Sequence, residues 1–139
     1  MSLTIVLSII FIHWVADFIF QAEEWANNKS KSFIALLKHT TTYSFIWLLV
    51  MVGFSVWGNH FGGPKMEDLG WSEWMILFPV ITFVFHTATD YFTSKIVSRK
   101  FANKEYGSPI PNTGAFTVIG FDQVLHYIQL FGTYYLLTK

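Results

Sequence analysis

Four long apolar segments constrain the fold of this chain more than any other feature of its sequence. They cover residues 3–21, 33–57, 74–97 and 115–137. A helix of about 20 predominantly apolar residues spans the hydrocarbon core of a bilayer, so each segment is long enough to cross a membrane. Charged residues make up only 13% of the chain and aromatic residues 19%. A soluble domain of this size could not bury so many aromatic side chains and still keep a polar surface. We therefore predict an all-α fold, an integral membrane four-helix bundle that forms a single domain over residues 1–139.

Lysine and arginine are distributed unevenly among the connecting segments. Seven of the nine basic residues lie in or beside the first and third connections: Lys29, Lys31, Lys38, Lys95, Arg99, Lys100 and Lys104. The second connection and the termini hold only Lys65 and Lys139. Because cytoplasmic loops are enriched in basic residues, this asymmetry predicts that both termini lie on the outer side. The basic side chains then have two open roles, which are contact with anionic lipid and capture of a phosphorylated substrate.

The composition also excludes several classes of function. The formal net charge is zero, so no overall basic field draws nucleic acid, and we expect none as a partner. The chain has no cysteine, which excludes disulfides, thiolate metal sites and thiol catalysis. The first apolar segment lacks the basic start and the small-residue cleavage site of a signal peptide, so we expect it to be a membrane helix.

Every apolar segment carries a histidine, and three of them carry an aspartate four residues away. The polar residues are His13, Asp17 and Gln21 in the first segment, His39 in the second, His86 and Asp90 in the third, and Asp122, Gln123 and His126 in the fourth. The spacing of four places both members of a pair on one helical face. A charged side chain in a membrane helix costs at least about 2.5–3.5 kcal/mol, so the aspartates require partners or water.

These polar residues share one depth in the predicted bundle. Asp17 lies four residues from the cytoplasmic end of its segment and His39 six residues from that end. Asp90 and Asp122 each lie seven residues in. At 1.5 Å per residue these positions are about 6–11 Å from the same membrane face. We therefore predict one shared site that opens towards the cytoplasmic loops.

Four imidazoles and three carboxylates form a ligand set typical of zinc, manganese or iron. The expected ligands of one to three divalent ions, with zinc favoured, are His13, Asp17, His39, His86, Asp90, Asp122 and His126. A metal ion acidifies its bound water towards about pH 7, which makes hydrolysis the natural reaction. One of the aspartates is then the candidate general base, and Gln21 and Gln123 are candidates for orienting substrate or ligands. The spacing differs from the Glu-x-x-His motif of di-iron bundles, which disfavours oxygen chemistry.

Several motifs together resemble those of a known protein family. They are HWVADFIFQ, WANNKSKS, LLKH, HTATDYFTSK and FDQVLH, which are spread over most of the chain. They are similar to motifs of the small bacterial and phage inner-membrane proteins that are grouped as a domain of unknown function. The resemblance implies an inner-membrane location and marks the polar residues named above together with Lys29. A looser similarity, to membrane proteins described as metal-dependent hydrolases and to the His-x-x-x-Asp pairs of zinc phospholipases, favours hydrolysis without naming a substrate.

The leading interpretation is a metal-dependent hydrolase of a phosphoester or another ester, and lipid-linked esters are among its candidate substrates. One alternative is a relay for protons or divalent cations, which would form a homo-oligomer. The outer halves of the second and third segments carry no charge. This favours a site that is closed on the outer side over a path for ions through the membrane. Another alternative is haem held by two histidines, which the neighbouring aspartates disfavour. The last is a non-catalytic membrane protein that binds other proteins.

Overall fold

The computed structural model describes residues 1–61, 75–103 and 113–139, and Lys65 and Lys104 lie outside these ranges. Within them all regular structure is helical, which confirms the all-α prediction. The α-helices are α1 (Leu3–Trp14), α2 (Glu23–Asn28), α3 (Phe33–Phe61), α4 (Leu77–Asn103) and α5 (Thr113–Leu137), and the π-helical segment η1 (Val15–Ile19) continues α1.

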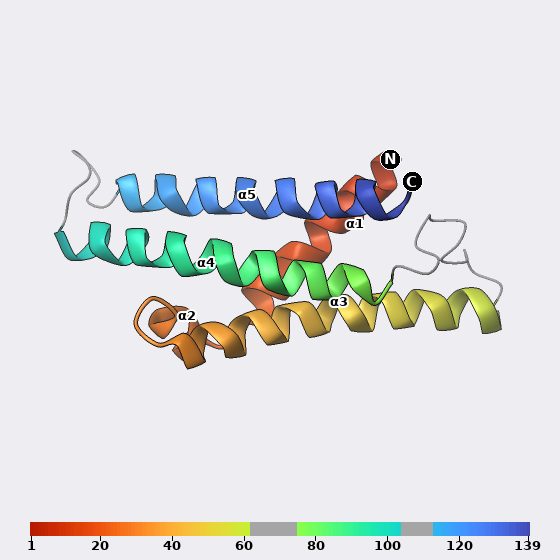
Figure 1. Cartoon of the computed structure of the whole chain (residues 1–139), viewed down its shortest axis with the longest axis horizontal. Helices are drawn as coiled ribbons and strands as arrows, with labels where there is room; N and C mark the ends of the chain where they lie inside the picture. The colour runs from red at the N-terminus through yellow and green to blue at the C-terminus, as the bar shows by residue number, and fades with distance from the viewer. Residues whose placement is uncertain (62–74, 104–112) are drawn as a thin grey trace.

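The three long helices lie side by side, and α1 crosses them obliquely (Figure 1). Helix α4 packs against both α3 and α5, whereas α1 contacts α5 and η1 contacts α3. Both chain termini lie at one end of the molecule, and α2 lies at the other end beside the start of α3 (Figure 1). Helix α4 therefore ends, and helices α3 and α5 begin, in the half of the molecule that holds α2 (Figure 1).

The structure changes the predicted boundaries of the first and third segments. The first was expected to be one helix over 3–21, but its α-helical part ends at Trp14 and its π-helical part at Ile19. Gln21 lies beyond both, so it does not continue the helical face of Asp17 as predicted. The third segment continues as helix α4 to Asn103, six residues past its predicted end, because no glycine or proline interrupts it.

Helix α2 was not predicted, since residues 22–32 were expected to be a connection. Its sequence EEWANN begins with two acidic residues, Glu23 and Glu24, which favour the positive end of the helix dipole. Asn28 closes the helix by donating from its side chain to the carbonyl of Glu24 at 2.8 Å. At six residues the helix is short, and it leads directly into the turn that holds Lys29.

The interior of the bundle has an apolar part and a polar part. The apolar part, which is nearer the termini, contains Ile9, Trp47, Met51, Phe78 and Leu130, all at most 2% exposed. The ring centroids of Trp47 and Phe78 lie 5.1 Å apart in an edge-to-face contact that joins α3 to α4. This packing fixes the three long helices relative to one another and so positions the polar side chains that follow along each helix.

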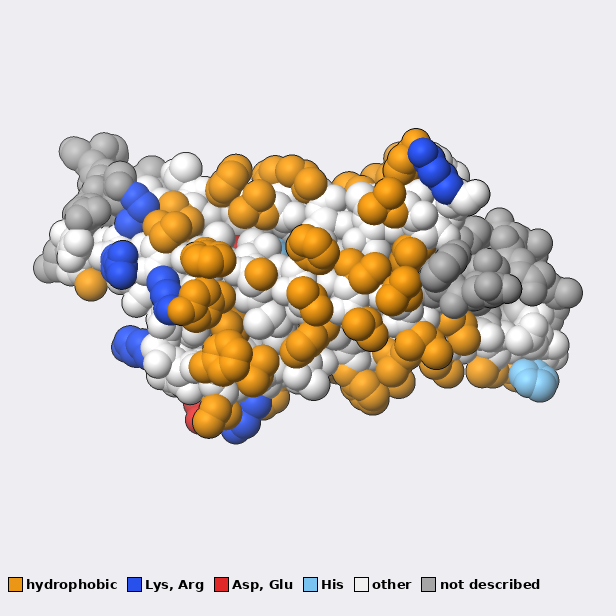
Figure 2. All heavy atoms as spheres, in the orientation of Figure 1, with side chains coloured by type: hydrophobic (Ala, Val, Ile, Leu, Met, Phe, Trp, Pro, Cys, Tyr) orange, Lys and Arg blue, Asp and Glu red, His pale blue; other side chains and the backbone are white. Residues whose placement is uncertain are grey.

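The outer surface is rich in apolar side chains. Figure 2 shows them spread over the middle of the visible face, with lysine and arginine gathered mainly at the end that holds α2. By length and hydropathy, one described helix, α3, qualifies as a candidate membrane span. Of the residues in its apolar 18-residue stretch, 28% are buried. The core helix of a soluble protein can meet the same criteria, and the α1–η1 helix is apolar but shorter. Four membrane-spanning helices therefore stay a prediction.

Candidate metal centre

The polar part of the interior brings together all seven residues that the sequence predicted as ligands. Every one is buried, with exposed fractions between 0% and 8%: His13, Asp17, His39, His86, Asp90, Asp122 and His126. They come from α1, η1, α3, α4 and α5, so the site exists only when the whole bundle has assembled. The structure thus brings the seven residues together in one place, whereas their common depth in a membrane and their role as ligands stay predictions.

Asp17 anchors the first of two groups with the geometry of a metal site. Its Oδ1 lies 3.1 Å from Nε2 of His39 and 3.4 Å from Nε2 of His86, and the two nitrogens are themselves 3.1 Å apart. The three atoms thus form a nearly equilateral triangle. Asp17 belongs to the π-helical segment η1, and such segments are frequent at functional sites because they change the direction in which a side chain points.

Asp90 completes a second triangle on the same pair of histidines. Its Oδ2 lies 3.1 Å from Nε2 of His39 and 3.7 Å from Nε2 of His86. The other oxygen of this carboxylate, Oδ1, lies 3.3 Å from Nε2 of His126. His86, Asp90 and His126 form a second group of ligand atoms that lie within 4.8 Å of one another. His86 belongs to both groups, so it is the centre of the cluster.

The distances in the first triangle match those between ligands around a tetrahedral ion. Zinc binds imidazole nitrogen and carboxylate oxygen at about 2.0–2.1 Å, which separates neighbouring ligands by about 3.3 Å in tetrahedral geometry. The three edges among Asp17, His39 and His86 measure 3.1, 3.1 and 3.4 Å. The arrangement can therefore hold an ion with only small side-chain movements.

Asp122 lies at the edge of the cluster and is held by neighbours from two helices. Its Oδ1 accepts a hydrogen bond from the Thr93 hydroxyl at 2.5 Å, and its Oδ2 lies 3.4 Å from Nε2 of His126. The side-chain amide of Gln123 donates to Oδ2 of Asp122 at 3.2 Å and to Oδ2 of Asp17 at 3.3 Å. Gln123 thus bridges two carboxylates of the cluster, and its role in orienting substrate or ligands stays a prediction.

His13 is engaged differently from the other three histidines. Its Nδ1 lies 2.7 Å from the Tyr43 hydroxyl, and its Nε2 lies 2.8 Å from Oε1 of Gln123. Both contacts are satisfied when Nε2 donates to Gln123 and Nδ1 accepts from Tyr43. Because both ring nitrogens have partners, the geometry favours His13 as a residue that orients Gln123 and leaves its role as a ligand a prediction.

Lys29 provides a positive charge beside the cluster. Its ammonium lies 2.9 Å from Oδ2 of Asp90, and its side chain is 20% exposed. Burial alone would lower the pKa of Lys29, but the carboxylates of Asp90 and Asp17 raise it above the ordinary value. Lys29 therefore carries its charge and joins the turn after α2 to the buried site.

Several buried polar atoms have no hydrogen-bond partner in the described part of the chain. In the cluster they include Oδ1 of Asp17, Nδ1 of His86 and both ring nitrogens of His126. Nε2 of His126 lies close to two carboxylates without hydrogen-bond geometry to either. Because buried polar atoms are normally satisfied, these unpaired donors and acceptors are places that a metal ion could fill.

Sequence reasoning missed the contacts between helices. Lys29 was assigned to topology or substrate capture, and its contact with Asp90 spans 61 positions of sequence. Thr93 carried no predicted role, although its spacing of three from Asp90 places it on a similar face of α4. Gln21 was predicted to orient substrate or ligands, but its buried Oε1 has no hydrogen-bond partner among the described residues.

A polar network outside the predicted site was also missed. Gln129 donates to the hydroxyls of Thr82 at 3.2 Å and Thr133 at 3.0 Å, so polar contacts join α4 and α5 in the half nearer the termini. The prediction for that half rested on charge alone, and the second and third segments carry none there. On α3, after His39, the buried atoms Ser44 Oγ and Trp47 Nε1 have no hydrogen-bond partner in the described residues.

A family model described as protein of unknown function (DUF3307) matches residues 5–139 of the chain. The chain belongs to this family. The match covers nearly the whole sequence and includes every residue of the cluster. No curated protein and no solved structure matches the chain. Membership of the DUF3307 family therefore agrees with the predicted resemblance to a family of unknown function and assigns no chemistry.

Proposed function

We propose that this member of the DUF3307 family is a metal-dependent membrane hydrolase that cleaves a phosphoester or another ester. The observation that carries the proposal is the triangle formed by Asp17 Oδ1, His39 Nε2 and His86 Nε2, with edges of 3.1–3.4 Å. Oxygen and imidazole ligands at this spacing suit zinc, with manganese or iron as alternatives.

Charge balance supports a divalent ion in this site. Three buried carboxylates face one ammonium, that of Lys29, which leaves two negative charges when the histidines are neutral. One divalent cation neutralises them. A purely hydrogen-bonded cluster is harder to satisfy. His39 Nε2 and His86 Nε2 lie 3.1 Å from each other and 3.1 and 3.4 Å from Oδ1 of Asp17, and at most one N–H on each nitrogen cannot satisfy all three contacts.

The surface supports a location within a membrane. Large apolar side chains are exposed around the bundle, for example Phe11 at 61%, Phe85 at 55% and Ile128 at 63%. Contiguous apolar surface of this kind is rare on soluble monomers. We propose that four helices cross the inner membrane, formed by α1 with η1, α3, α4 and α5, and that the basic end containing α2 faces the cytoplasm (Figure 2).

The residues around the proposed ion divide into ligands and groups that handle protons. The ion would be held by His39, His86, Asp17 and Asp90, and it would acidify a bound water. Asp122 lies at the edge of the cluster and would accept the proton of that water. In the reaction the water oxygen bonds to phosphorus, the bond from phosphorus to the alcohol oxygen breaks, and the alcohol leaves after taking up the proton.

Elemental analysis of the purified protein tests the proposal. We expect about one equivalent of a transition metal or more per chain, because the cluster presents two overlapping groups of ligand atoms. His60→Ala, which removes an exposed histidine at the end of α3, is the matched control and retains the metal. A content below about a tenth of an equivalent in wild type after supply with zinc, manganese and iron in turn contradicts the proposal.

Activity is tested separately with the metal-loaded protein and a chromogenic phosphoester. We expect Asp122→Asn to lose hydrolysis while it keeps the metal, because Asp122 lies outside both groups of ligand atoms. A loss of about 100-fold or more fits the role of a general base. Hydrolysis that is equal in wild type and Asp122→Asn contradicts this assignment.

The network of Gln129, Thr82 and Thr133 favours a second candidate, a relay for protons or divalent cations. Polar residues in the half nearer the termini would extend the path from the cluster across the bundle. A flux of protons or zinc into liposomes that is lost in Asp90→Asn would favour transport over hydrolysis. A wild-type flux no greater than that of empty liposomes would contradict the relay function.

A further inference from the structure

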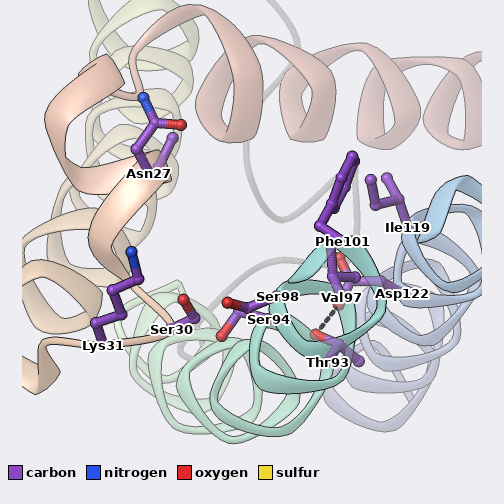
Figure 3. Close-up of a pocket in the computed structure, with 11 residues that line it drawn as sticks. Asn27, Ser30, Lys31, Thr93, Ser94, Val97, Ser98, Phe101, Ile119 and Asp122 are labelled. Atoms are coloured by element: carbon purple, nitrogen blue, oxygen red, sulfur yellow. Dashed lines mark hydrogen bonds between the residues drawn. The ribbon is translucent and has the colours of Figure 1, made fainter. Parts of the chain in front are cut away.

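A hollow of about 280 Å³ lies beside the cluster at the end that holds α2. Figure 3 shows residues from three elements around it: Asn27, Ser30 and Lys31 from α2 and the turn that follows, Ser94 and Ser98 from α4, and Asp122 from α5. Because Asp122 also lies 3.4 Å from His126, the hollow reaches the edge of the candidate metal centre. It is therefore the natural place for a substrate of that centre.

One side of the hollow is lined by hydrogen-bond donors and a cation. The hydroxyls of Ser30, Ser94 and Ser98 lie near one another, with the Lys31 side chain beside them (Figure 3). Ser94 Oγ is buried and has no hydrogen-bond partner in the described residues. A buried hydroxyl without a partner beside a hollow is a site where a ligand atom completes the hydrogen bonding.

The opposite side of the hollow carries apolar side chains beside Asp122 and Thr93 (Figure 3). These are Val97 and Phe101 of α4 and Ile119 of α5. A ligand that fits both sides has a polar anionic end and an apolar remainder. The volume is close to the lower limit for small-molecule sites, about 300 Å³, so it accommodates a headgroup and not an entire lipid.

A second hollow on the other side of the same turn strengthens the preference for anions. It shares Ser30 and Lys31 with the first and is lined in addition by Lys29 and Lys95. The segment Lys29–Ser32 therefore separates two hollows that three lysines line between them. Among the described lining residues of both hollows, Asp122 is the only carboxylate, which disfavours a cation as the ligand.

We infer that the hollow between the α2 turn, α4 and α5 binds the phosphate group of a lipid and presents its ester bond to Asp122. Lys31 and the serine hydroxyls contact the phosphate oxygens, and Val97 and Phe101 contact the start of the apolar chains. Phosphate suits this lining because it accepts several hydrogen bonds and carries negative charge. The inference rests on the proposed hydrolase and names its substrate class.

Binding to the full-length protein in detergent with EDTA tests the inference without metal or turnover. The probes are dihexanoyl phosphatidic acid, dihexanoylglycerol and glycerol 3-phosphate, measured by isothermal titration calorimetry. We expect the first to bind, and the second, which lacks phosphate, and the third, which lacks apolar chains, to bind at least about tenfold more weakly. A failure of the proposed metal site leaves this result unaffected, so the two failures are distinguishable.

Two variants and a control identify the site. Lys31→Gln removes an exposed cation, and we expect binding to weaken about tenfold, the usual effect of losing one charge-assisted contact. Ser94→Val removes the unpaired hydroxyl and adds bulk to the hollow, and we expect a similar or larger loss. Lys38→Gln, an exposed lysine of α3 outside the hollow, should change affinity less than about twofold.

Several outcomes overturn the inference. Equal affinity for dihexanoylglycerol and dihexanoyl phosphatidic acid shows that phosphate is not recognised. Equal affinity for glycerol 3-phosphate shows that the ligand is a soluble phosphoester and not a lipid. Unchanged affinity in Lys31→Gln and Ser94→Val, both with the melting temperature of wild type, shows that the phosphate binds elsewhere.

Discussion

Replacing His86 by phenylalanine is the most informative perturbation of the cluster. The His86 ring is fully buried between Tyr43 and His126, with ring centroids 3.9 and 4.1 Å away in stacked arrangements. Phenylalanine preserves an aromatic ring in this stack and removes both ring nitrogens. Because His86 belongs to both groups of ligand atoms, the variant tests them together.

The expected rise in melting temperature on metal binding follows from the linkage between binding and stability. A metal that binds only the folded protein stabilises it by about 2.7 kcal/mol at a free concentration 100 times Kd. At roughly 3–4 °C per kcal/mol for a chain of this length, the wild-type melting temperature should rise by about 8–11 °C. We expect His86→Phe to show no rise, because His86 is the one residue that both groups of ligand atoms share.

The metal-free variant should also be less stable than metal-free wild type. It loses the contact of His86 with Asp17 at 3.4 Å and with His39 at 3.1 Å, and a buried polar group left unpaired costs about 1–3 kcal/mol. The assay is a fluorescence melting curve in detergent with and without zinc, and His60→Ala serves as the control that keeps the full rise. A variant that keeps the metal-dependent rise, or a wild type that shows none at saturating zinc, would refute the reasoning.

Two further substitutions test the charge balance and the core. Lys29→Met removes the ammonium 2.9 Å from Asp90, so we expect tighter zinc binding, by about tenfold or more in titration calorimetry, and looser or equal binding would contradict the charge argument. Trp47→Ala leaves a cavity in the core, where Trp47 is 1% exposed, and we expect a loss of about 3–5 kcal/mol in unfolding free energy. Trp57→Ala, at a residue that is 50% exposed, is its control, and equal losses in the two variants would place the core elsewhere.

The spacing of polar residues within each helix was enough to predict that the cluster exists. His86 and Asp90 lie one turn apart on α4, and Asp122 and His126 lie one turn apart on α5, so each pair had to share a face. The long apolar segments predicted that the fold is helical. The basic residues predicted the orientation of each segment, and from it a common depth for the polar groups. These features depend on the chain near each residue, which is why sequence alone revealed them.

The spacing of residues within each helix did not predict the contacts between helices. The hydrogen bond between His13 and Tyr43 crosses from α1 to α3, and no periodicity of either helix predicts it. The change from α- to π-helix after Trp14 was also missed, because the apolar pattern continues through it. As a consequence Gln21 was expected on the face of Asp17, and the helix ends before it.

X-ray absorption spectroscopy on the purified wild-type protein at the zinc edge tests the central claim most directly. We predict a bound ion whose nearest neighbours are nitrogen and oxygen at about 2.0–2.1 Å, with the outer scattering of imidazole rings. The scattering from imidazole should disappear in His86→Phe and persist in His60→Ala. A protein that takes up no zinc, manganese or iron, or one whose bound ion lacks imidazole neighbours, would contradict the assignment of this buried cluster as a metal centre.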